Sequence, residues 1–191
     1  CGSPGATSGW WARGQWSSRR AEAPVAAPVI AAAAPVKAAD PAAPIDLEKF
    51  RRLMPDAIPG GWVRAGMNIK NSGAGGVSGP TMEAVYERGR QRLFVRLIDV
   101  GPEGAAKMVA DQQALRPARQ DADGYLAYAA EGERFLIKEE SRNAGIARAI
   151  TIVRNRVALS LEGTGGVTMD ELTSAQGLVD MERVDQVARG L

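Results

Sequence analysis

The chain has 191 residues, with 24 Lys and Arg, 22 Asp and Glu, no His and a single Cys. These counts exclude catalysis by Ser-His-Asp or Cys-His groups, zinc fingers, His-ligated metal centres and a disulfide framework within the chain. Hydrophobic residues make up 45% of the sequence, which is enough for one folded domain and a tail.

The composition changes near residue 45. Residues 1–45 hold 14 Ala and 6 of the 11 Pro but no Leu, Phe or Tyr, so they cannot bury enough apolar surface to offset the entropy of ordering. This part carries four basic and two acidic residues, whereas residues 46–191 carry 20 of each. A neutral domain argues against a nucleic-acid partner. We divide the chain into an anchor segment with clustered Trp and Arg (1–20), an Ala/Pro-rich tether (21–45) and a single domain (46–191).

The first five residues are Cys1-Gly2-Ser3-Pro4-Gly5. A Cys followed by small residues resembles the processed N-terminus of bacterial lipoproteins. The resemblance implies diacylglycerol on the Cys1 sulfur and acylation of its amine, and it implies no other cofactor. Several acyl chains anchor firmly, since each buried CH₂ contributes about 0.8 kcal/mol. Gly2, in the place of an aspartate, matches outer-membrane rather than inner-membrane sorting, so we expect a lipid-anchored protein on the periplasmic side. The alternative is a fragment that happens to begin at Cys.

The rest of the anchor segment, after Cys1, is rich in aromatic and basic side chains. Three of the four Trp and three Arg lie within it: Trp10, Trp11, Arg13, Trp16, Arg19 and Arg20. Indole rings favour the bilayer interface, and Arg can meet anionic headgroups. Trp and Arg are also the residue types that dominate protein interfaces. We therefore expect a contact with lipid or with a partner protein; uncontacted side chains and stacking on nucleic acid are the remaining alternatives.

Residues 21–45 repeat Ala, Pro and Val loosely. This Pro density favours extended polyproline II structure at about 3.1 Å per residue, so the segment could reach roughly 75 Å. Pro24, Pro28 and Pro35 also interrupt the uncharged stretch, which excludes a transmembrane helix here. The tether would hold the domain away from the membrane or run along a protein partner.

The first half of the domain shows helix and strand patterns in turn. Residues 46–53 predict a short helix that Pro55 ends, and a strand follows over 62–70. The Gly- and Ser-rich residues 71–80 predict a flexible loop. Residues 81–87 and 91–100 then form a hairpin, and a helix runs over 102–115.

The second half predicts two more hairpins, over 124–140 and 148–162, and a last helical region from Thr168 to Leu191. Thr168 and Glu171 fit a capping box at the start of that region. Strands joined by short turns imply an α+β domain with a mainly antiparallel sheet of about six to seven strands. We expect the helices on one face of this sheet and an extended N-terminal tail before it.

The run from Leu53 to Trp62, Leu-Met-Pro-Asp-Ala-Ile-Pro-Gly-Gly-Trp, resembles the L-P-x-x-P-G-W opening of a group of bacterial envelope proteins, with Met54 and Gly61 as extra residues. In that group a Y-x-x-G strand pair, a helix and a G-Y strand follow. The matching positions are 86–89 and Gly124-Tyr125, so the resemblance spans residues 47–191. It implies an envelope location and this fold, and it implies no active site.

Two short motifs are similar to ligand sites but lack residues that such sites need. Gly163-Thr164-Gly165-Gly166 lies between a strand and a helix, yet no Lys follows in phosphate-loop register and Asp170 and Glu171 would repel an anion. Residues 121–124, Asp-Ala-Asp-Gly, begin like a calcium loop, but the later oxygen ligands are missing. The first is interpreted as a plain loop and the second as a polar turn, and no metal is predicted.

Arg90, Arg92 and Arg96 are spaced by even numbers and would share one face of their strand. A basic face could meet an acidic partner or lipid headgroups. The favoured interpretation is a solvated face on which these Arg pair across strands with Glu83, Glu87 or Glu133.

Together these patterns predict a non-enzymatic envelope lipoprotein that serves as an accessory or scaffold subunit of a membrane-associated complex. The expected partners are membrane lipid through Cys1 and a protein along residues 1–45. The alternative is a periplasmic module that binds a ligand or lipid in a deep apolar pocket. An enzyme would have to work with Asp, Glu, Lys, Arg, Ser or Tyr alone, and no motif supports one.

Overall fold

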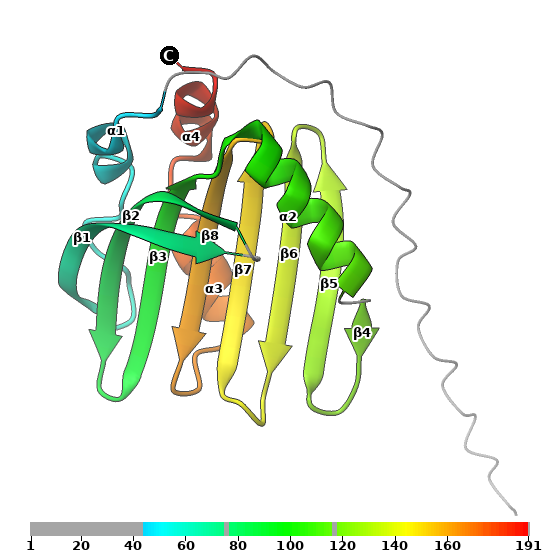
Figure 1. Ribbon diagram of the computed structural model, residues 1–191. Helices are drawn as coiled ribbons and strands as arrows, with labels where there is room; N and C mark the ends of the chain where they lie inside the picture. Colours follow the sequence, from blue (N-terminus) through cyan, green and yellow to red (C-terminus); the bar gives the residue numbers. More distant parts are fainter. Residues whose placement is uncertain (1–43, 75–76, 116–117, 191) are drawn as a thin grey trace, which may run out of the picture.

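The computed structural model describes residues 44–74, 77–115 and 118–190. Its centre is one 8-stranded antiparallel sheet with the strand order β1-β2-β3-β8-β7-β6-β5-β4 (Figure 1). The strands are β1 (Val63–Ala74), β2 (Val77–Arg88), β3 (Gln91–Asp99), β4 (Arg119–Gln120), β5 (Gly124–Glu131), β6 (Arg134–Ser141), β7 (Ile146–Val153) and β8 (Val157–Thr164).

Four helices cover the sheet: α1 (Leu47–Arg51), α2 (Gly101–Leu115), α3 (Met169–Gln176) and α4 (Met181–Ala188). We call the face toward α2 the front face and the face toward α3 the back face. Figure 1 shows α2 lying across the front of the sheet and α3 behind it. In the described part of the chain, no helix is long and apolar enough to span a membrane.

The predicted α+β class, with a mainly antiparallel sheet, is confirmed. Two details differ from the expectation. The sheet has eight strands, because the two-residue strand β4 pairs with β5 at one edge. Helices also lie on both faces rather than one. The central strands explain this, since Ile150 to Val153 on β7 are all buried, and a strand buried on both sides needs a cover on both sides.

The back core is the larger of the two apolar clusters. Leu93, Val95 and Leu97 alternate along β3 toward this face, and Leu172 of α3 and Val184 of α4 pack with them. Phe50 brings α1 into the same cluster, so three helices share one face of the sheet. Burial of this apolar surface is the main force that holds the helices on the sheet.

The front core is smaller and lies under α2. Met108 of α2 packs with Ile98, Ile150 and other front-facing residues of β3 and β5 to β8. Tyr128 stacks against Phe135 with ring centroids 6.1 Å apart. The Tyr128 hydroxyl donates a hydrogen bond to the Gln112 carbonyl at 2.9 Å, which ties the end of α2 to the sheet.

The predicted loop at residues 71–80 is wrong, because both strands of the first hairpin continue through it as far as Ala74 and Val77. The reason is visible at Gly79. A Cβ on this residue would lie 2.3 Å from the Asp99 carbonyl oxygen, so glycine serves a close approach of backbones rather than flexibility. Figure 1 shows the far end of the hairpin bending across the front face.

The predicted helical region after Thr168 is two helices instead of one. Its start is confirmed, since Thr168 and Glu171 form both hydrogen bonds of a capping box. The chain then leaves the helical path after Gln176. Asp180 begins α4 as a new N-cap, and its carboxylate accepts hydrogen bonds from the backbone N–H groups of Glu182 and Arg183.

Candidate functional site

Most of the predicted contact residues lie outside the residues that the structure describes. These are Cys1, Trp10, Trp11, Arg13, Trp16, Arg19 and Arg20. Their roles stay predictions from the sequence. The structure places the remaining predicted residues, Arg90, Arg92 and Arg96, in the second hairpin of the sheet.

The three Arg of the predicted basic face do not form one stripe. Arg90 lies in the turn between β2 and β3 rather than on the strand. Arg92 pairs with Glu87 at 3.0 Å, and Arg96 pairs with Glu83 at 2.6 Å. The predicted pairing across strands is therefore confirmed for these two, but the expected solvated face is wrong for Arg96 and Glu83, whose side chains are 14% and 5% exposed. Glu133, the third proposed partner, instead lies 3.8 Å from Arg154.

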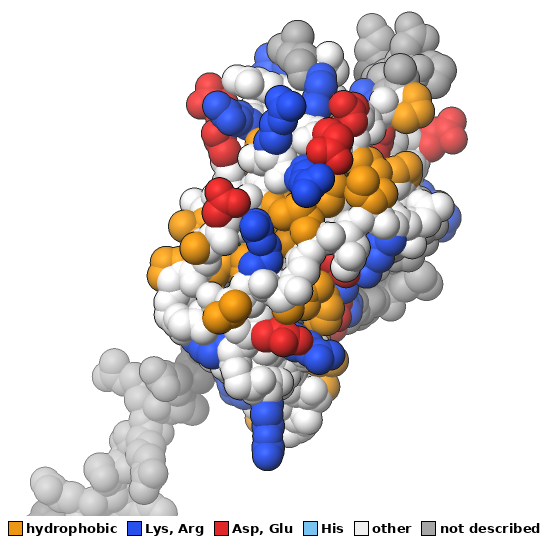
Figure 2. Space-filling model, turned by 90° about the vertical axis from the view of Figure 1, so that its left-hand side faces the viewer, with side chains coloured by type: hydrophobic (Ala, Val, Ile, Leu, Met, Phe, Trp, Pro, Cys, Tyr) orange, Lys and Arg blue, Asp and Glu red, His pale blue; other side chains and the backbone are white. Residues whose placement is uncertain are grey.

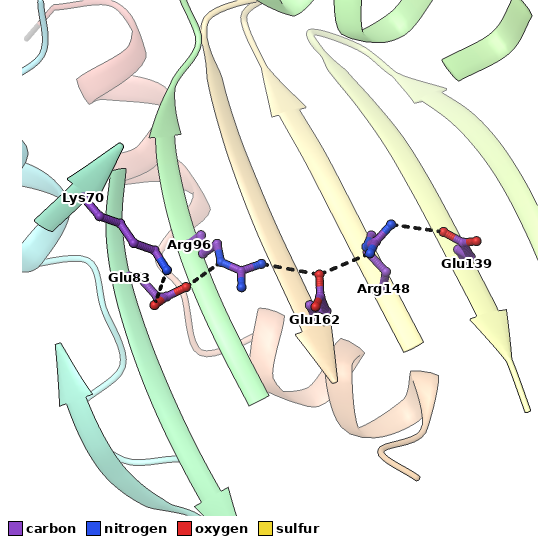
Figure 3. A network of polar contacts seen from close by, with 6 residues as sticks. All are labelled: Lys70, Glu83, Arg96, Glu139, Arg148 and Glu162. Carbon is purple, nitrogen blue, oxygen red and sulfur yellow. Dashed lines mark hydrogen bonds and ion pairs between the residues drawn. The ribbon is translucent and has the colours of Figure 1, made fainter. Parts of the chain in front are cut away.

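Arg96 belongs to a row of charges that crosses the front face. Six neighbouring strands contribute one residue each, in alternating sign (Figure 3): Lys70, Glu83, Arg96, Glu162, Arg148 and Glu139. The nitrogen-to-oxygen distances between successive members are 2.6, 2.6, 3.4, 3.2 and 3.5 Å. We call this set the charge row.

Strand register produces the charge row. Glu83 lies directly opposite Arg96, and Arg148 lies directly opposite both Glu162 and Glu139 on its two sides. Opposite residues share a face, so these side chains meet. Arg96 reaches Glu162 diagonally, because Phe94 is the direct partner of Glu162. The Arg96 guanidinium also lies over the Phe94 ring, 4.9 Å from its centroid.

Glu83 is the most buried acid of the charge row, with its side chain 5% exposed. Burial acts to raise the pKa of Glu83, but hydrogen bonds and charge from Lys70 and Arg96 outweigh it and hold the pKa below its usual value. The carboxylate is therefore ionised at neutral pH. With three cations and three anions, the row has no net charge, and it links six strands rather than presenting a basic surface.

A second polar contact holds Ile45, near the start of the domain, against the sheet. The Ile45 N–H donates to an Asp99 carboxylate oxygen at 2.9 Å, at the end of β3. Arg156 lies 3.4 Å from the other oxygen of Asp99, and both side chains are 8% exposed. Residue 45, where the predicted tether ends, is thus fixed to the central part of the sheet.

The residues of the L-P-x-x-P-G-W resemblance serve packing. Leu53 and Trp62 are buried in the back core. The Tyr86 hydroxyl donates a hydrogen bond to the Pro55 carbonyl, and burial raises the pKa of Tyr86. The Arg88 guanidinium lies over the Trp62 ring, 4.5 Å from the centroid, and also pairs with Glu171 of α3. The motif thus joins α1, the first hairpin and α3.

The interpretation of Asp121 to Gly124 as a turn agrees with the structure. The Asp121 carboxylate accepts hydrogen bonds from the N–H groups of Asp123 and Gly124 at 3.0 and 3.1 Å. Asp123 accepts from the Ser141 hydroxyl and the Asn143 N–H at 2.9 and 2.7 Å. Within the described ranges, no group of three His, Cys, Asp or Glu side chains could hold a metal ion.

The surface feature that the sequence did not reveal is the outer strand β1. It is 12 residues long and forms one edge of the sheet, with β2 on one side. Three large apolar side chains are exposed among those described, Val63 (69%), Ile69 (58%) and Leu178 (42%), and two of them are on β1. Figure 2 faces this side of the molecule and shows apolar side chains gathered in a band bordered by charged ones.

No known protein family, curated protein or solved structure matches the chain. Three structural features bear on function: the internally paired charge row, the attachment of Ile45 to Asp99, and the edge of β1, with which no second strand pairs among the described residues.

Proposed function

We propose that this protein is a non-enzymatic, lipid-anchored accessory or scaffold subunit of a membrane-associated complex in the cell envelope. The tail would attach it through Cys1, and the domain would contribute a docking surface for a protein partner. The observation that carries the proposal is the open β1 edge. An edge strand offers unpaired backbone N–H and C=O groups, which a second chain can use.

The length and exposure of β1 support docking. Strands average about five to six residues, and an exposed edge is usually kept short or covered. β1 has 12 residues, and Val63 and Ile69 on it are more than half exposed. Apolar side chains beside free backbone groups suit a protein partner, because burying them adds to the hydrogen bonds of a shared sheet.

The attachment at Ile45 supports a scaffold role. The Ile45 N–H is held by Asp99, whose carboxylate pairs with Arg156 beneath the surface. A pull on the tail would therefore act on β3 and β8, which are central strands, rather than peel away a peripheral helix. A domain held at its centre can carry load between a membrane anchor and a partner.

Solubilisation of native membranes in a mild detergent tests the proposal. We expect the protein to sediment with membranes and then to migrate well above the mass of a single copy, together with a fixed partner. The Cys1→Ser variant, expressed from the native gene, should move to the soluble fraction, because it has no thiol to acylate. A wild-type protein that is soluble, or that migrates alone at its monomer mass, would overturn the proposal.

The alternative, a periplasmic module for a ligand or lipid, stays a prediction from the sequence. The same solubilised membranes distinguish this function from a scaffold role. A ligand-binding module would be recovered with small molecules or lipids that native mass spectrometry detects, and without a partner protein in fixed ratio.

A further inference from the structure

We infer that the occupant of the β1 edge is a second copy of this chain, whose own β1 pairs antiparallel with the first about a twofold axis at Ile69. The inference rests on the proposed function for the docking role of β1, and it names the partner that docks there. The sheets of the two copies then continue into one another across the axis.

The backbone phase of β1 decides which of its groups can reach a second chain. Pro80 of β2 lies opposite Asn71 and has no N–H to donate, so this pair fits a non-hydrogen-bonded position of the ladder. Alternation places Ile69 and Met67 in the same position. The N–H and C=O groups of these three residues of β1 therefore point away from β2, toward the edge.

The turn between β2 and β3 gives the same phase independently. Two residues lie between Arg88 and Gln91, the last pair of this hairpin, and the pair that closes such a turn is hydrogen-bonded. The β2–β3 register has no shift, so every second residue back from Arg88 also directs its backbone groups to β3, as far as Met82. Met82 is the residue opposite Ile69, which therefore has its own backbone groups free for the edge.

A second copy of β1 matches the first when Ile69 lies on the twofold axis. Met67 then lies opposite Asn71 of the other copy, so all three residues with outward groups exchange N–H and C=O groups across the axis. Ile69, which is 58% exposed, meets its own counterpart on the back face, and Asn68 meets Lys70 on the front face. Pairing therefore covers the exposed apolar side chain and sets no like charges opposite each other.

Other positions of the axis along β1 are less favourable. An axis at Lys70 would set two Lys side chains directly opposite each other. An axis at Asn71 would leave Ile69 facing a glycine, which has no side chain to cover it. An axis at Asn68 would bring Asn71 opposite the bulge at residues 64–66, where the register shifts.

The cations of β1 do not oppose a second copy. Lys70 lies 2.6 Å from Glu83, and Arg64 lies 3.3 Å from Asp56, within the same chain. A charged side chain on an edge strand usually hinders pairing, but here each cation already has an anion beside it. The edge is therefore close to neutral in its setting, and a strand of the same composition can lie against it.

The two edges of the sheet favour twofold over head-to-tail association. β1 has 12 residues, whereas β4 at the opposite edge has two, Arg119 and Gln120, both exposed. Head-to-tail addition would set the long edge against the short, charged one and leave chains free to grow. Pairing of β1 with β1 uses the long edge of both copies and closes as a dimer.

Sedimentation equilibrium of the full chain carrying Cys1→Ser tests the inference. This variant has no acyl chain and no thiol, so neither lipid nor a disulfide can hold two copies together. We expect its average mass to rise with concentration from that of one copy toward that of two. A mass of one copy at every concentration up to about 0.5 mM would overturn the inference.

Hydrogen exchange locates the contact on the same chain. Exchange at the N–H groups of Met67 and Ile69 should slow as the concentration rises, because these groups gain partners in the dimer. The N–H groups of Asn68 and Lys70 face β2 in one copy already, so their exchange should not change. A dimer without this alternation would overturn the inference, and the measurement needs no substitution in β1.

Opposite charges at Ile69 test the axis itself. Ile69→Lys and Ile69→Glu each place like charges opposite each other across the axis, and each should weaken association about tenfold or more. An equimolar mixture should restore association, because Lys then faces Glu. Leu178→Lys is the matched control, since it replaces an exposed apolar residue outside β1 and should leave association unchanged. Circular dichroism checks that the variants fold.

The outcomes separate this inference from the proposed function. A dimer that survives Ile69→Lys, or a mixture of the two charged variants that stays monomeric, would overturn the inference. If wild type nevertheless remains in a membrane complex with another protein, the proposed function stands and the partner at β1 is not a second copy. A wild-type protein that does not sediment with membranes contradicts the proposed function instead, whatever its mass in solution.

Discussion

The two faces of the sheet are closed in different ways. The back face is covered by α1, α3 and α4 over a continuous apolar cluster. The front face is apolar only where α2 crosses it, and elsewhere the charge row links the strands. Apolar contact with helices closes the back face, whereas ion pairs between partly buried side chains link the strands of the front face. A helix therefore covers the front face only where its strands present apolar side chains.

The back face should be the more sensitive of the two. Leu172 of α3 is fully buried there, and truncating it would leave a cavity between α3 and the sheet. Leu172→Ala should lower the free energy of unfolding by about 2–5 kcal/mol. Urea denaturation followed by circular dichroism measures the change. A loss below about 1 kcal/mol would mean that α3 repacks freely, and the contrast between the faces would then fail.

The charge row should depend most on Glu83, because its carboxylate contacts two cations and is buried. Glu83→Gln leaves Lys70 without its anion and Arg96 with Glu162 alone, and we expect a loss of about 1–3 kcal/mol in the same urea assay. Glu87→Gln is the matched control, since Glu87 is an exposed glutamate on the same strand and face. Equal losses in the two variants would show that the row adds nothing beyond an ordinary surface pair.

Acid should weaken the front face through the same residue. The pKa of Glu83 is lowered in the folded state, while the pKa of a Glu in the unfolded chain is about 4.3. The stability that ionised Glu83 contributes is therefore fully present above the pKa of the unfolded chain. It is lost as the pH falls through the lower pKa of the folded state. The gap between wild-type and Glu83→Gln in unfolding free energy should narrow below about pH 4.

Other acidic residues should make wild type and Glu83→Gln equally sensitive to acid. The pKa values of Glu171 and Asp185 are also lowered; burial opposes the shift, and their hydrogen bonds with Thr168 and Arg88, or with Arg154 and Arg189, outweigh it. Both variants retain these groups, so their acid sensitivity cancels in the comparison. A gap that stays constant from neutral to acid pH would contradict a stabilising role for the Glu83 charge.

Local patterns predicted much of the sheet, because hairpins depend on neighbouring residues. The even spacing of Arg92 and Arg96 and their pairing with Glu87 and Glu83 followed from a single hairpin. The rest of the charge row did not, since β3 and β8 pair although 57 residues separate their ends. Register between strands so distant in the chain leaves no local signal, so Glu162 and Arg148 could not be assigned to the row.

Local sequence patterns also could not predict which face of the sheet each helix covers, or that β1 lies at an edge. Spacing of Ala105 and Met108 predicts that α2 is amphipathic, but the side of the sheet that it covers depends on the path of the chain. The Gly-rich run at 71–80 indicated a loop, although its glycine at 79 permits close packing against Asp99. Only the strand order identified β1 as an edge.

The smallest effect should come from the exposed pair beside the charge row. Arg92 and Glu87 lie 3.0 Å apart with side chains 61% and 43% exposed, so Arg92→Ala should cost about 0–1 kcal/mol, and added salt should screen the pair. Arg96→Ala is its counterpart within the row, four residue pairs along the same hairpin. It removes a buried contact to Glu83 and one to Glu162, and its larger loss should persist in about 1 M salt. Urea unfolding at low and high salt separates the two cases. If salt erased both losses equally, the row would act as ordinary surface charge, and its pairing would not explain the stability of the front face.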